Sequence, residues 1–284
     1  MEQVYLFDTT LRDGQQTQGV DFSSSDKTRI AIALDKLGVD YIEGGWPGAN
    51  PTDSEFFKMT PKTKATFTAF GMTKRSGFSV ENDDVLSAVI NANTKAVCLV
   101  GKAHDFHVRK ALGITLEDNL HNIRESISYL VSKGREAIFD CEHFFDGFND
   151  NPDYALLVAK TAYEAGARWV VLCDTNGGTM PQTVSAATEA VIFTGIPGSH
   201  IGIHAHNDTE HAVANSLAAI EAGARHVQGT LNGLGERCGN ANLVSIIPTL
   251  LLKEPYKSKY KLNVDLEKLS QLTSISRALD DVLN

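Results

Sequence analysis

Short apolar runs alternate with amphipathic stretches along most of the chain. The apolar runs are rich in β-branched and aromatic residues, which predicts strands. We expect these strands at residues 4–8, 40–44, 65–70, 96–100, 136–141, 168–174, 200–206 and 226–232. Between and after them, apolar positions recur every three or four residues, which predicts helices. We expect the helices at residues 26–38, 50–59, 81–90, 115–134, 151–167, 181–193, 209–224 and 242–253.

The predicted strands are continuous apolar runs without strict polar–apolar alternation. Strands of a parallel sheet that helices cover have this pattern. Eight strand–helix units over about 250 residues are typical of an α/β fold of the (β/α)8 TIM barrel type, which we expect over residues 1–255. Glycine at the helix ends in KLGVDYI, EAGARWV and EAGARHV favours left-handed helix caps. A doubly wound sheet is the competing fold, but no GxGxxG turn follows the first strand.

The alternation ends after Lys253. Residues 254–263 are polar, and residues 264–284 have an amphipathic helical pattern that no strand follows. We therefore expect residues 256–284 to form a C-terminal helical extension, the start of a subdomain that is otherwise absent.

Composition and charge argue against several classes of protein. The formal net charge is −9 and no basic run is present, which argues against binding to nucleic acid or to an anionic membrane surface. No apolar run approaches the ~20 residues of a membrane span, and no signal-peptide pattern follows Met1. The four cysteines lack a CxxC spacing, so we expect reduced thiols in a cytoplasmic protein.

The first predicted strand runs into the motif FDTTLRDGQQ. In a TIM barrel, the chemistry lies where strands end and the loops to the helices begin. The motif offers Asp8, Arg12 and Asp13 within one short turn. Carboxylates are ligands for divalent cations, and a guanidinium can stabilise negative charge that develops on an oxygen. A salt-bridged loop would contain the same residues, so this motif alone leaves both interpretations open.

Two histidines mark the end of the seventh predicted strand, in IHAHND. His204 and His206 are two residues apart on extended backbone, so both rings face the same side. Two hydrogen-bonded core histidines are the alternative, but this spacing at a strand end favours a pair of metal ligands.

A glycine-rich segment, GTLNGLGERCGNAN, follows the eighth predicted strand. Its glycines allow tight turns, and Glu236, Arg237 and Asn240 bring polar groups back over the strand ends. Strands one, seven and eight are neighbours in a closed barrel. We therefore expect Asn240 to converge with Asp13 and the two histidines.

Weaker signals follow the second, fifth and sixth predicted strands. The polar residues at these strand ends are Glu43, Asp140, Glu142, His143, Asp174 and Thr175. Any of them could line the cavity. For His143, and for His104 and His107 in KAHDFHV, a hydrogen-bonded loop histidine is the favoured interpretation.

The motifs together resemble one enzyme family. FDTTLRDGQQ, HAHND, AVANSLAAIEAGA and NGLGERCGNANL are similar to the signature regions of the 2-isopropylmalate, homocitrate and citramalate synthases. These belong to the metal-dependent lyase-type TIM barrels, which also include 3-hydroxy-3-methylglutaryl-CoA lyase. YIEGGWPGANPTDSEFF, DFHVRKALGITLEDNL, CEHFFDGFNDNPDYA and VLCDTNGGTMP resemble the (R)-citramalate synthase branch, and the resemblance covers nearly the whole chain.

The resemblance implies a metal site. A divalent cation, Mg2+, Mn2+ or Zn2+, would be the cofactor. Its ligands would be Asp13, His204 and His206, with Asn240 as a further or water-mediated ligand.

The resemblance also implies a substrate site. Arg12 would be catalytic and substrate-binding, because it would stabilise the oxygen of the reacting carbonyl or enolate. Glu142 (catalytic) and Thr175 (substrate-binding) match positions that hold the 2-oxo acid and metal-bound waters. The motifs nominate neither a general base nor a binding site for the acyl-CoA.

The activity that the resemblance implies is an acyl transfer in isoleucine biosynthesis. Acetyl-CoA, as co-substrate, would condense with pyruvate to give citramalate and CoA, in a cytoplasmic enzyme that is expected to be a homodimer. The alternatives are 2-isopropylmalate synthesis from 2-oxoisovalerate, a lyase of the hydroxymethylglutaryl-CoA type, with which Cys238 invites comparison, and a truncated metal-binding barrel without turnover.

The chain departs from the family pattern in two ways. Family synthases usually continue into a helical subdomain and a regulatory domain, whereas this sequence ends at Asn284. His104 stands where the citramalate branch is expected to have tryptophan.

Overall fold

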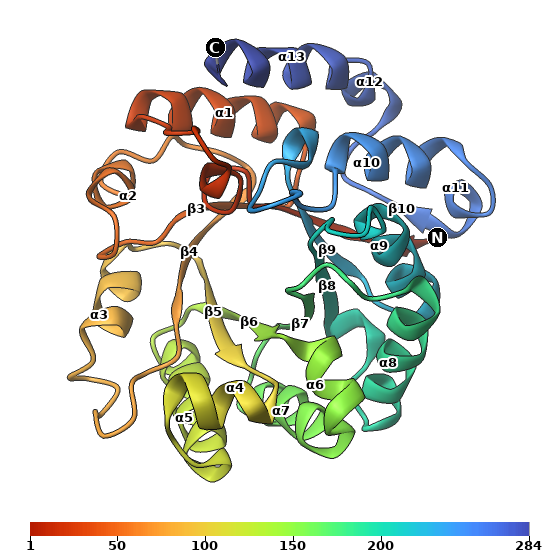
Figure 1. The fold of residues 1–284 in the computed structure, drawn as a ribbon. Coiled ribbons are helices and arrows are strands. Elements are labelled where there is room, and N and C mark those ends of the chain that lie inside the picture. The colour runs from red at the N-terminus through yellow and green to blue at the C-terminus, as the bar shows by residue number, and fades with distance from the viewer. Residues whose placement is uncertain (284) are drawn as a thin grey trace.

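A computed structural model describes residues 1–283 of the chain. Within these residues, parallel strands close into a barrel in the order β2-β3-β4-β5-β6-β7-β8-β9, and helices surround it (Figure 1). The strands are β2 (Tyr5–Asp8), β3 (Tyr41–Gly45), β4 (Thr66–Met72), β5 (Ala96–Lys102), β6 (Glu136–Glu142), β7 (Trp169–Asp174), β8 (Ile201–Ala205) and β9 (His226–Gly229). Parallel pairing of β2 with β9 closes the sheet, which confirms the predicted (β/α)8 TIM barrel.

The helices that follow the strands agree with the amphipathic pattern. They are α1 (Ser24–Leu37), α2 (Pro51–Phe56), α3 (Asp84–Asn91), α5 (Leu116–Ser132), α7 (Pro152–Glu164), α8 (Pro181–Phe193), α9 (Ala212–Ala222) and α10 (Leu243–Leu252). Ser23 begins α1 with a capping box, and Gly38 ends it with φ 95°, as the KLG pattern predicts. Among the described residues, no helix is both long and apolar enough to cross a membrane.

Several short elements escaped the sequence pattern because each has too few residues to show a period. They are η1 (Gly14–Gln16), α4 (Asp105–His107), η2 (Val108–Leu112), α6 (Phe144–Asp150), η3 (Gly198–His200) and η4 (Leu231–Gly233). Elements η1, α4, α6 and η4 follow the carboxyl ends of barrel strands. They therefore shape the end of the barrel at which the polar motifs lie.

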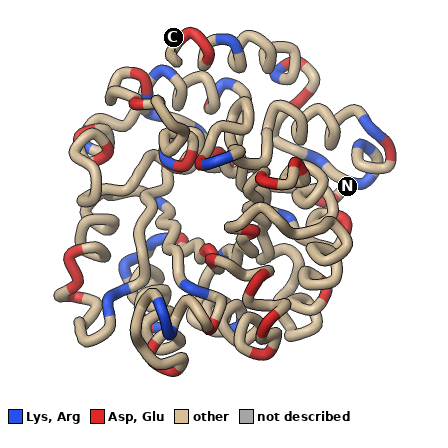
Figure 2. The backbone as a smooth tube through the Cα atoms, viewed as in Figure 1, with Lys and Arg blue, Asp and Glu red and all other residues tan. Residues whose placement is uncertain are grey.

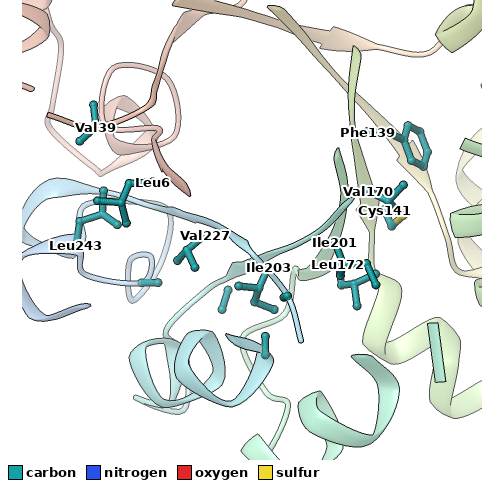
Figure 3. Close-up of a cluster of buried hydrophobic side chains, with 14 of the residues drawn as sticks. Leu6, Val39, Phe139, Cys141, Val170, Leu172, Ile201, Ile203, Val227 and Leu243 are labelled. Carbon is teal, nitrogen blue, oxygen red and sulfur yellow. The ribbon is translucent and has the colours of Figure 1, made fainter. Parts of the chain in front are cut away.

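Two layers of apolar side chains hold the barrel together. Residues on the outer face of the strands pack against the helices. Figure 3 shows part of this layer: the strand residues Leu6, Phe139, Cys141, Val170, Leu172, Ile201, Ile203 and Val227, with Val39 from the loop before β3 and Leu243 from α10. Alternate residues, such as Ile138, face the inside. Because the side-chain period of a strand is two, Asp140 and Glu142 belong to this inner set.

Aromatic residues fill the amino end of the barrel. Phe7, Tyr41, Trp169 and His226 are buried and in ring contact, and Trp169 Nε1 donates to the Tyr41 hydroxyl at 3.1 Å. Burial lowers the pKa of His226 to about 3, so this histidine stays neutral. The closed floor restricts access to the barrel interior to its carboxyl end.

The residues after α10 pack on the barrel. They form α11 (Tyr256–Lys259), β10 (Tyr260–Lys261), α12 (Leu266–Leu269) and α13 (Leu272–Leu283). Strand β10 pairs in parallel with β1 (Glu2–Gln3), and α13 lies beside α1 (Figure 1) with Ile275 and Leu279 buried. The expectation that these residues begin a further subdomain stays a prediction.

Charged residues of both signs are interspersed around the barrel. In the view of Figure 2, lysines and arginines alternate with aspartates and glutamates over the helices and loops. No single-sign patch dominates this view, in keeping with the scattered charges of the sequence.

Leu172 tests the contribution of the layer between strands and helices. It is fully buried on β7, so Leu172→Ala should lower the free energy of unfolding by about 2–5 kcal/mol. Urea unfolding monitored by circular dichroism would measure the change. Leu157→Ala on α7 is the control, because Leu157 is 47% exposed. Equal losses in the two variants would contradict this assignment.

Candidate functional site

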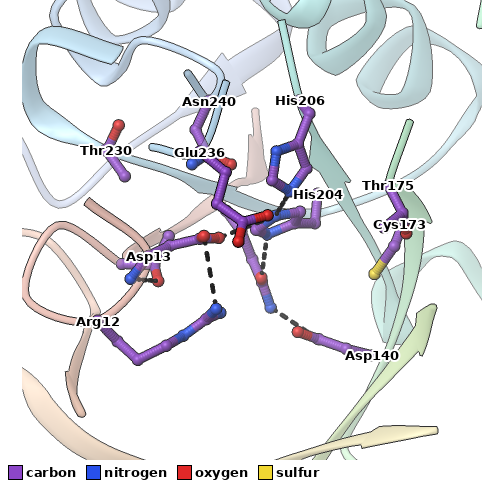
Figure 4. A network of polar contacts seen from close by, with 12 residues as sticks. Arg12, Asp13, Asp140, Cys173, Thr175, His204, His206, Thr230, Glu236 and Asn240 are labelled. Atoms are coloured by element: carbon purple, nitrogen blue, oxygen red, sulfur yellow. Dashed lines mark hydrogen bonds and ion pairs between the residues drawn. The ribbon is translucent and has the colours of Figure 1, made fainter. Parts of the chain in front are cut away.

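The predicted polar clusters meet in one cavity at the carboxyl end of the barrel. Its volume is about 310 Å³. Its walls include Arg12, Asp13, Trp46, Phe70, Lys102, Asp140, Glu142, Cys173, Thr175, His204, His206 and Glu236, several of which Figure 4 shows. A larger hollow of about 530 Å³ opens at the amino end, next to the starts of β2, β3 and β4, and it contains none of the predicted site residues.

Asp13, His204 and His206 form the centre of the site. All three are buried, and one possible ligand atom from each lies within 4.8 Å of the others. His204 Nε2 is 3.2 Å from Asp13 Oδ2 and 3.3 Å from His206 Nε2. Closure of the barrel through β2, β8 and β9 brings the two motifs together, as the sequence indicated.

Hydrogen bonds to His204 show that these residues fit a cation. Nδ1 of His204 is 2.7 Å from Gln228 Oε1, and a glutamine oxygen can only accept, so the proton of a neutral ring is on Nδ1. The Nε2 lone pair is then directed at the cluster, the arrangement that a metal-binding histidine requires. Burial lowers the pKa of His206 to about 4. His206 is therefore neutral at pH 7 and also offers a lone pair.

Asp13 is ionised. Burial opposes its charge, but the adjacent Arg12 guanidinium holds the pKa of Asp13 well below its usual range. The two oxygens differ in their contacts: Oδ1 is 3.5 Å from Arg12, whereas Oδ2 is buried without a hydrogen-bond partner among the described residues. A carboxylate oxygen in that situation, beside two imidazole lone pairs, matches a divalent-cation site.

Asn240 lies next to the cluster. A β-bridge pairs it with His206, and Figure 4 shows its side chain on the His206 side of the site. Its Nδ2 donates to the carbonyl of Leu234 at 3.1 Å, and its Oδ1 is buried without a partner among residues 1–283. The amide oxygen is therefore available as the further ligand that the sequence predicted.

Arg12 is fixed beside the cluster. Its Nε donates to Glu43 Oε2 at 2.7 Å, and its guanidinium carbon lies 4.0 Å from the centre of the Phe70 ring. Despite the opposing effect of burial, Asp13 and Glu43 raise the pKa of Arg12, so the guanidinium keeps its charge. The contact assigns a role to Glu43 of β3, which was a weak signal in the sequence.

Glu142 and Thr175 line the same cavity. Glu142 Oε2 pairs with Lys102 Nζ at 2.5 Å. The Thr175 hydroxyl accepts from the backbone N–H of His143 at 2.8 Å, and this bond fixes its oxygen. Both predicted residues are therefore placed where a bound molecule could touch them.

The loop after β9 is tied to two other loops. Arg237 Nε donates to Asp208 Oδ2 at 2.7 Å, and its Nη2 donates to the carbonyl of Thr175 at 2.8 Å. Glu236 thereby lies over the cavity (Figure 4). Cys238 is exposed and does not line the cavity, so the feature that suggested a lyase lies outside this site.

Other polar residues noted in the sequence have contacts outside the cavity. His104 Nε2 is 2.9 Å from Asp150 Oδ2, and the rings of His107 and His143 stack with centroids 4.0 Å apart. Asp174 accepts hydrogen bonds from Thr179. These residues lie around the site and are not among those that line its cavity.

Three further residues of the site escaped the sequence analysis. Gln228 fixes His204 and donates to Asp140 Oδ1 at 2.9 Å, Lys102 pairs with Glu142, and the Trp46 side chain lines the cavity. Period-two alternation from His226 could have placed Gln228 inside the barrel. Lys102 and Trp46 lie at or just beyond strand ends and carry no motif of their own.

The family comparison concerns almost the whole chain. The family model described as HMGL-like matches residues 3–275. The chain is 49% identical to the (R)-citramalate synthase of Synechocystis sp. and 50% identical to that of Aquifex aeolicus, over 99% and 100% of its own length. It covers 52% and 53% of those proteins, so the chain spans about half the length of the curated relatives it matches.

Solved structures agree with the fold. The HMG-CoA lyase of Bacillus subtilis superimposes with a TM-score of 0.82 at 20% sequence identity, covering 100% of this chain and 94% of the lyase. An identity this low supports a shared barrel and no shared substrate.

Asp13→Ala tests the cation site. Loss of a charged ligand should weaken Mn2+ binding by about 100-fold or more, because loss of an outer-shell partner alone costs about 10–100-fold. Isothermal titration calorimetry would measure the affinity. Asp153→Ala removes an exposed carboxylate on α7 and should leave the affinity unchanged. An unaltered affinity in folded Asp13→Ala would contradict the assignment.

Asp8 provides a test of pH dependence. Burial raises the pKa of Asp8 to about 7, although hydrogen bonds from Thr10 partly oppose this. The folded chain therefore binds this proton more tightly than the unfolded chain, whose aspartate pKa is about 3.9. The contribution of protonated Asp8 to the free energy of unfolding is complete below pH ~4 and is lost as the pH rises towards 7. Asp8→Asn should gain stability relative to the wild type as the pH rises across this range in urea unfolding, and an unchanged difference between the two proteins would contradict the assignment.

Proposed function

The chain belongs to the HMGL-like family, and from this premise we propose that it condenses acetyl-CoA with pyruvate to give citramalate and CoA. The methyl carbon of the acetyl group bonds to the keto carbon of pyruvate, the methyl loses a proton, and the keto oxygen gains one. Water then cleaves the thioester and releases CoA. The cytoplasmic location, the homodimer and the place in isoleucine biosynthesis stay predictions.

One observation carries the proposal. A charged arginine, a carboxylate and two neutral imidazoles converge on one cavity at the carboxyl end of the barrel. The relatives named as (R)-citramalate synthases, at 49% and 50% identity, support the choice of reaction.

The cation site would hold a divalent metal. Asp13, His204 and His206 would be its ligands, with Asn240 completing the set, and Mg2+, Mn2+ or Zn2+ each accept carboxylate, imidazole and amide ligands. When bound, the metal would act as a Lewis acid on a chelating 2-oxo acid.

Arg12 would stabilise the negative charge that develops on the keto oxygen. Its Nε is engaged by Glu43, and its stacking on Phe70 restricts the plane of the guanidinium. A donor that is fixed before the reaction does not have to reorganise as the charge forms. Thr175, held by the His143 N–H, would orient the substrate.

Glu142 would accept or hold a proton at the cavity wall. Its Oε2 is held by Lys102 Nζ, and a positioned carboxylate can accept a proton from water or substrate. Phe70, Met72, Val100 and Cys173 supply apolar surface in the same wall, which suits the methyl group of a small 2-oxo acid.

The test is release of CoA thiol from acetyl-CoA with Mn2+, comparing pyruvate, 2-oxoisovalerate and no acceptor. Pyruvate should give the fastest release. Arg12→Ala should reduce kcat about 10²–10³-fold, the usual cost of losing an oxyanion donor, with Mn2+ affinity within a few fold of wild type. Arg277→Ala, an exposed arginine on α13, is the control.

The comparison of acceptors distinguishes the alternative functions. Faster release with 2-oxoisovalerate would replace the citramalate assignment by 2-isopropylmalate synthesis. Cleavage of hydroxymethylglutaryl-CoA without condensation would indicate a lyase. Absence of release with any acceptor, in a chain that still binds Mn2+, would show that this chain does not turn over.

A further inference from the structure

A buried lysine, Lys27, lies next to the segments that carry Arg12 and Glu43. The Lys27 side chain is fully buried in the first turn of α1. Burial lowers the pKa of Lys27 in spite of the nearby Asp53 carboxylate. A positive charge is also disfavoured at a helix amino end. The position is therefore costly for an ammonium group, and its partners must compensate.

Three acceptors surround the ammonium group. Lys27 Nζ donates to the carbonyl of Leu11 at 2.7 Å, to the carbonyl of Gly44 at 3.0 Å, and to Asp53 Oδ1. An ammonium group has three hydrogens and no acceptor, so every donor is used. The acceptors come from the loop after β2, the end of β3 and the first turn of α2.

Two of these acceptors flank the pair that holds Arg12. Leu11 directly precedes Arg12, and Gly44 directly follows Glu43. Arg12 Nε donates to Glu43 Oε2 at 2.7 Å. Lys27 therefore fixes the backbone on both sides of the bond that aims the guanidinium, without touching the cavity itself.

The third acceptor extends the arrangement to the cavity wall. The second oxygen of Asp53, Oδ2, accepts from the backbone N–H of Trp46 at 2.7 Å, and the Trp46 ring packs edge-on against Phe70 with centroids 5.3 Å apart. Gly45 makes room for this contact, because a Cβ there would lie 2.3 Å from Asp53 Cγ. One ion pair thus anchors Arg12, Glu43 and the aromatic wall.

We propose that Lys27 and Asp53 are positioning residues that hold the guanidinium of Arg12 and the Trp46–Phe70 wall in the geometry that binds the 2-oxo acid. The inference rests on the proposed function for its substrate but not for its geometry. A buried pair that served stability alone could be replaced by apolar residues. A pair that positions Arg12 could not, because apolar residues supply no donor to Leu11 and Gly44.

Four variants distinguish these roles. Lys27→Met removes the ammonium group, and Asp53→Asn keeps an acceptor for Trp46 while removing the charge. Lys27→Met combined with Asp53→Leu replaces the pair by apolar side chains and should recover much of the stability lost in Lys27→Met. Glu2→Gln breaks a partly exposed ion pair with Arg225 near the amino end of the barrel and serves as the control.

The first readout needs no substrate. The Nε–H of Arg12, which donates to Glu43, is observable as a protected proton in ¹H–¹⁵N NMR and is assigned by its absence in Arg12→Lys. Exchange of this proton with water should accelerate at least about tenfold in Lys27→Met and in the double variant, less in Asp53→Asn, and not in Glu2→Gln.

The second readout is binding of pyruvate to the Mn2+-loaded chain by calorimetry. Affinity for pyruvate should fall about tenfold or more in Lys27→Met and in the double variant, while Mn2+ affinity changes less than about threefold. Thermal unfolding establishes that each variant is folded.

The outcomes separate this inference from the proposed function. Normal Arg12 protection in a folded double variant would overturn the positioning role and leave stability as the role of the pair. Failure of the wild type to bind any 2-oxo acid would overturn the proposed function, whereas the exchange rate of Arg12 would still decide the role of Lys27.

Discussion

The site depends on the pairing of β2 with β9. This pairing aligns Tyr5 with His226 and Asp8 with Gly229, and it joins the first and last strands of the barrel. Asp13 extends from one side of this seam, and Asn240 returns to it from the other. Without closure, the Asp13 carboxylate would lie far in space from His204 and His206 at the end of β8, and no cation site would exist.

Much of the barrel and of the cluster could be predicted from the sequence, because strands buried on both faces and polar strand ends leave a clear pattern. The convergence of Asp13 with His204 followed from barrel closure alone. The roles of Gln228 and Lys27 could not be predicted in this way. Both depend on contacts between segments distant in sequence, and a single glutamine or lysine carries no motif.

The buried charges around Arg12 and Lys27 are arranged in pairs of opposite sign. Arg12 lies between Asp13 and Glu43, and Lys27 lies against Asp53. Isolated charges in such an interior would be strongly destabilising. The arrangement keeps a guanidinium charged beside a cation site, where repulsion would otherwise oppose both. Substitutions in this network will therefore be coupled and not additive.

The pairing of β2 with β9 also determines when the cation site can form during synthesis of the chain. A ribosome adds about 5–20 residues per second, so tens of seconds pass between the emergence of Asp13 and that of Asn240. Throughout that interval β2 lacks β9 as its neighbour, and this edge of β2 is open to pairing with other chains. A nascent chain thus carries half of a metal site that cannot capture its ion until the segment up to Asn240 has been synthesised.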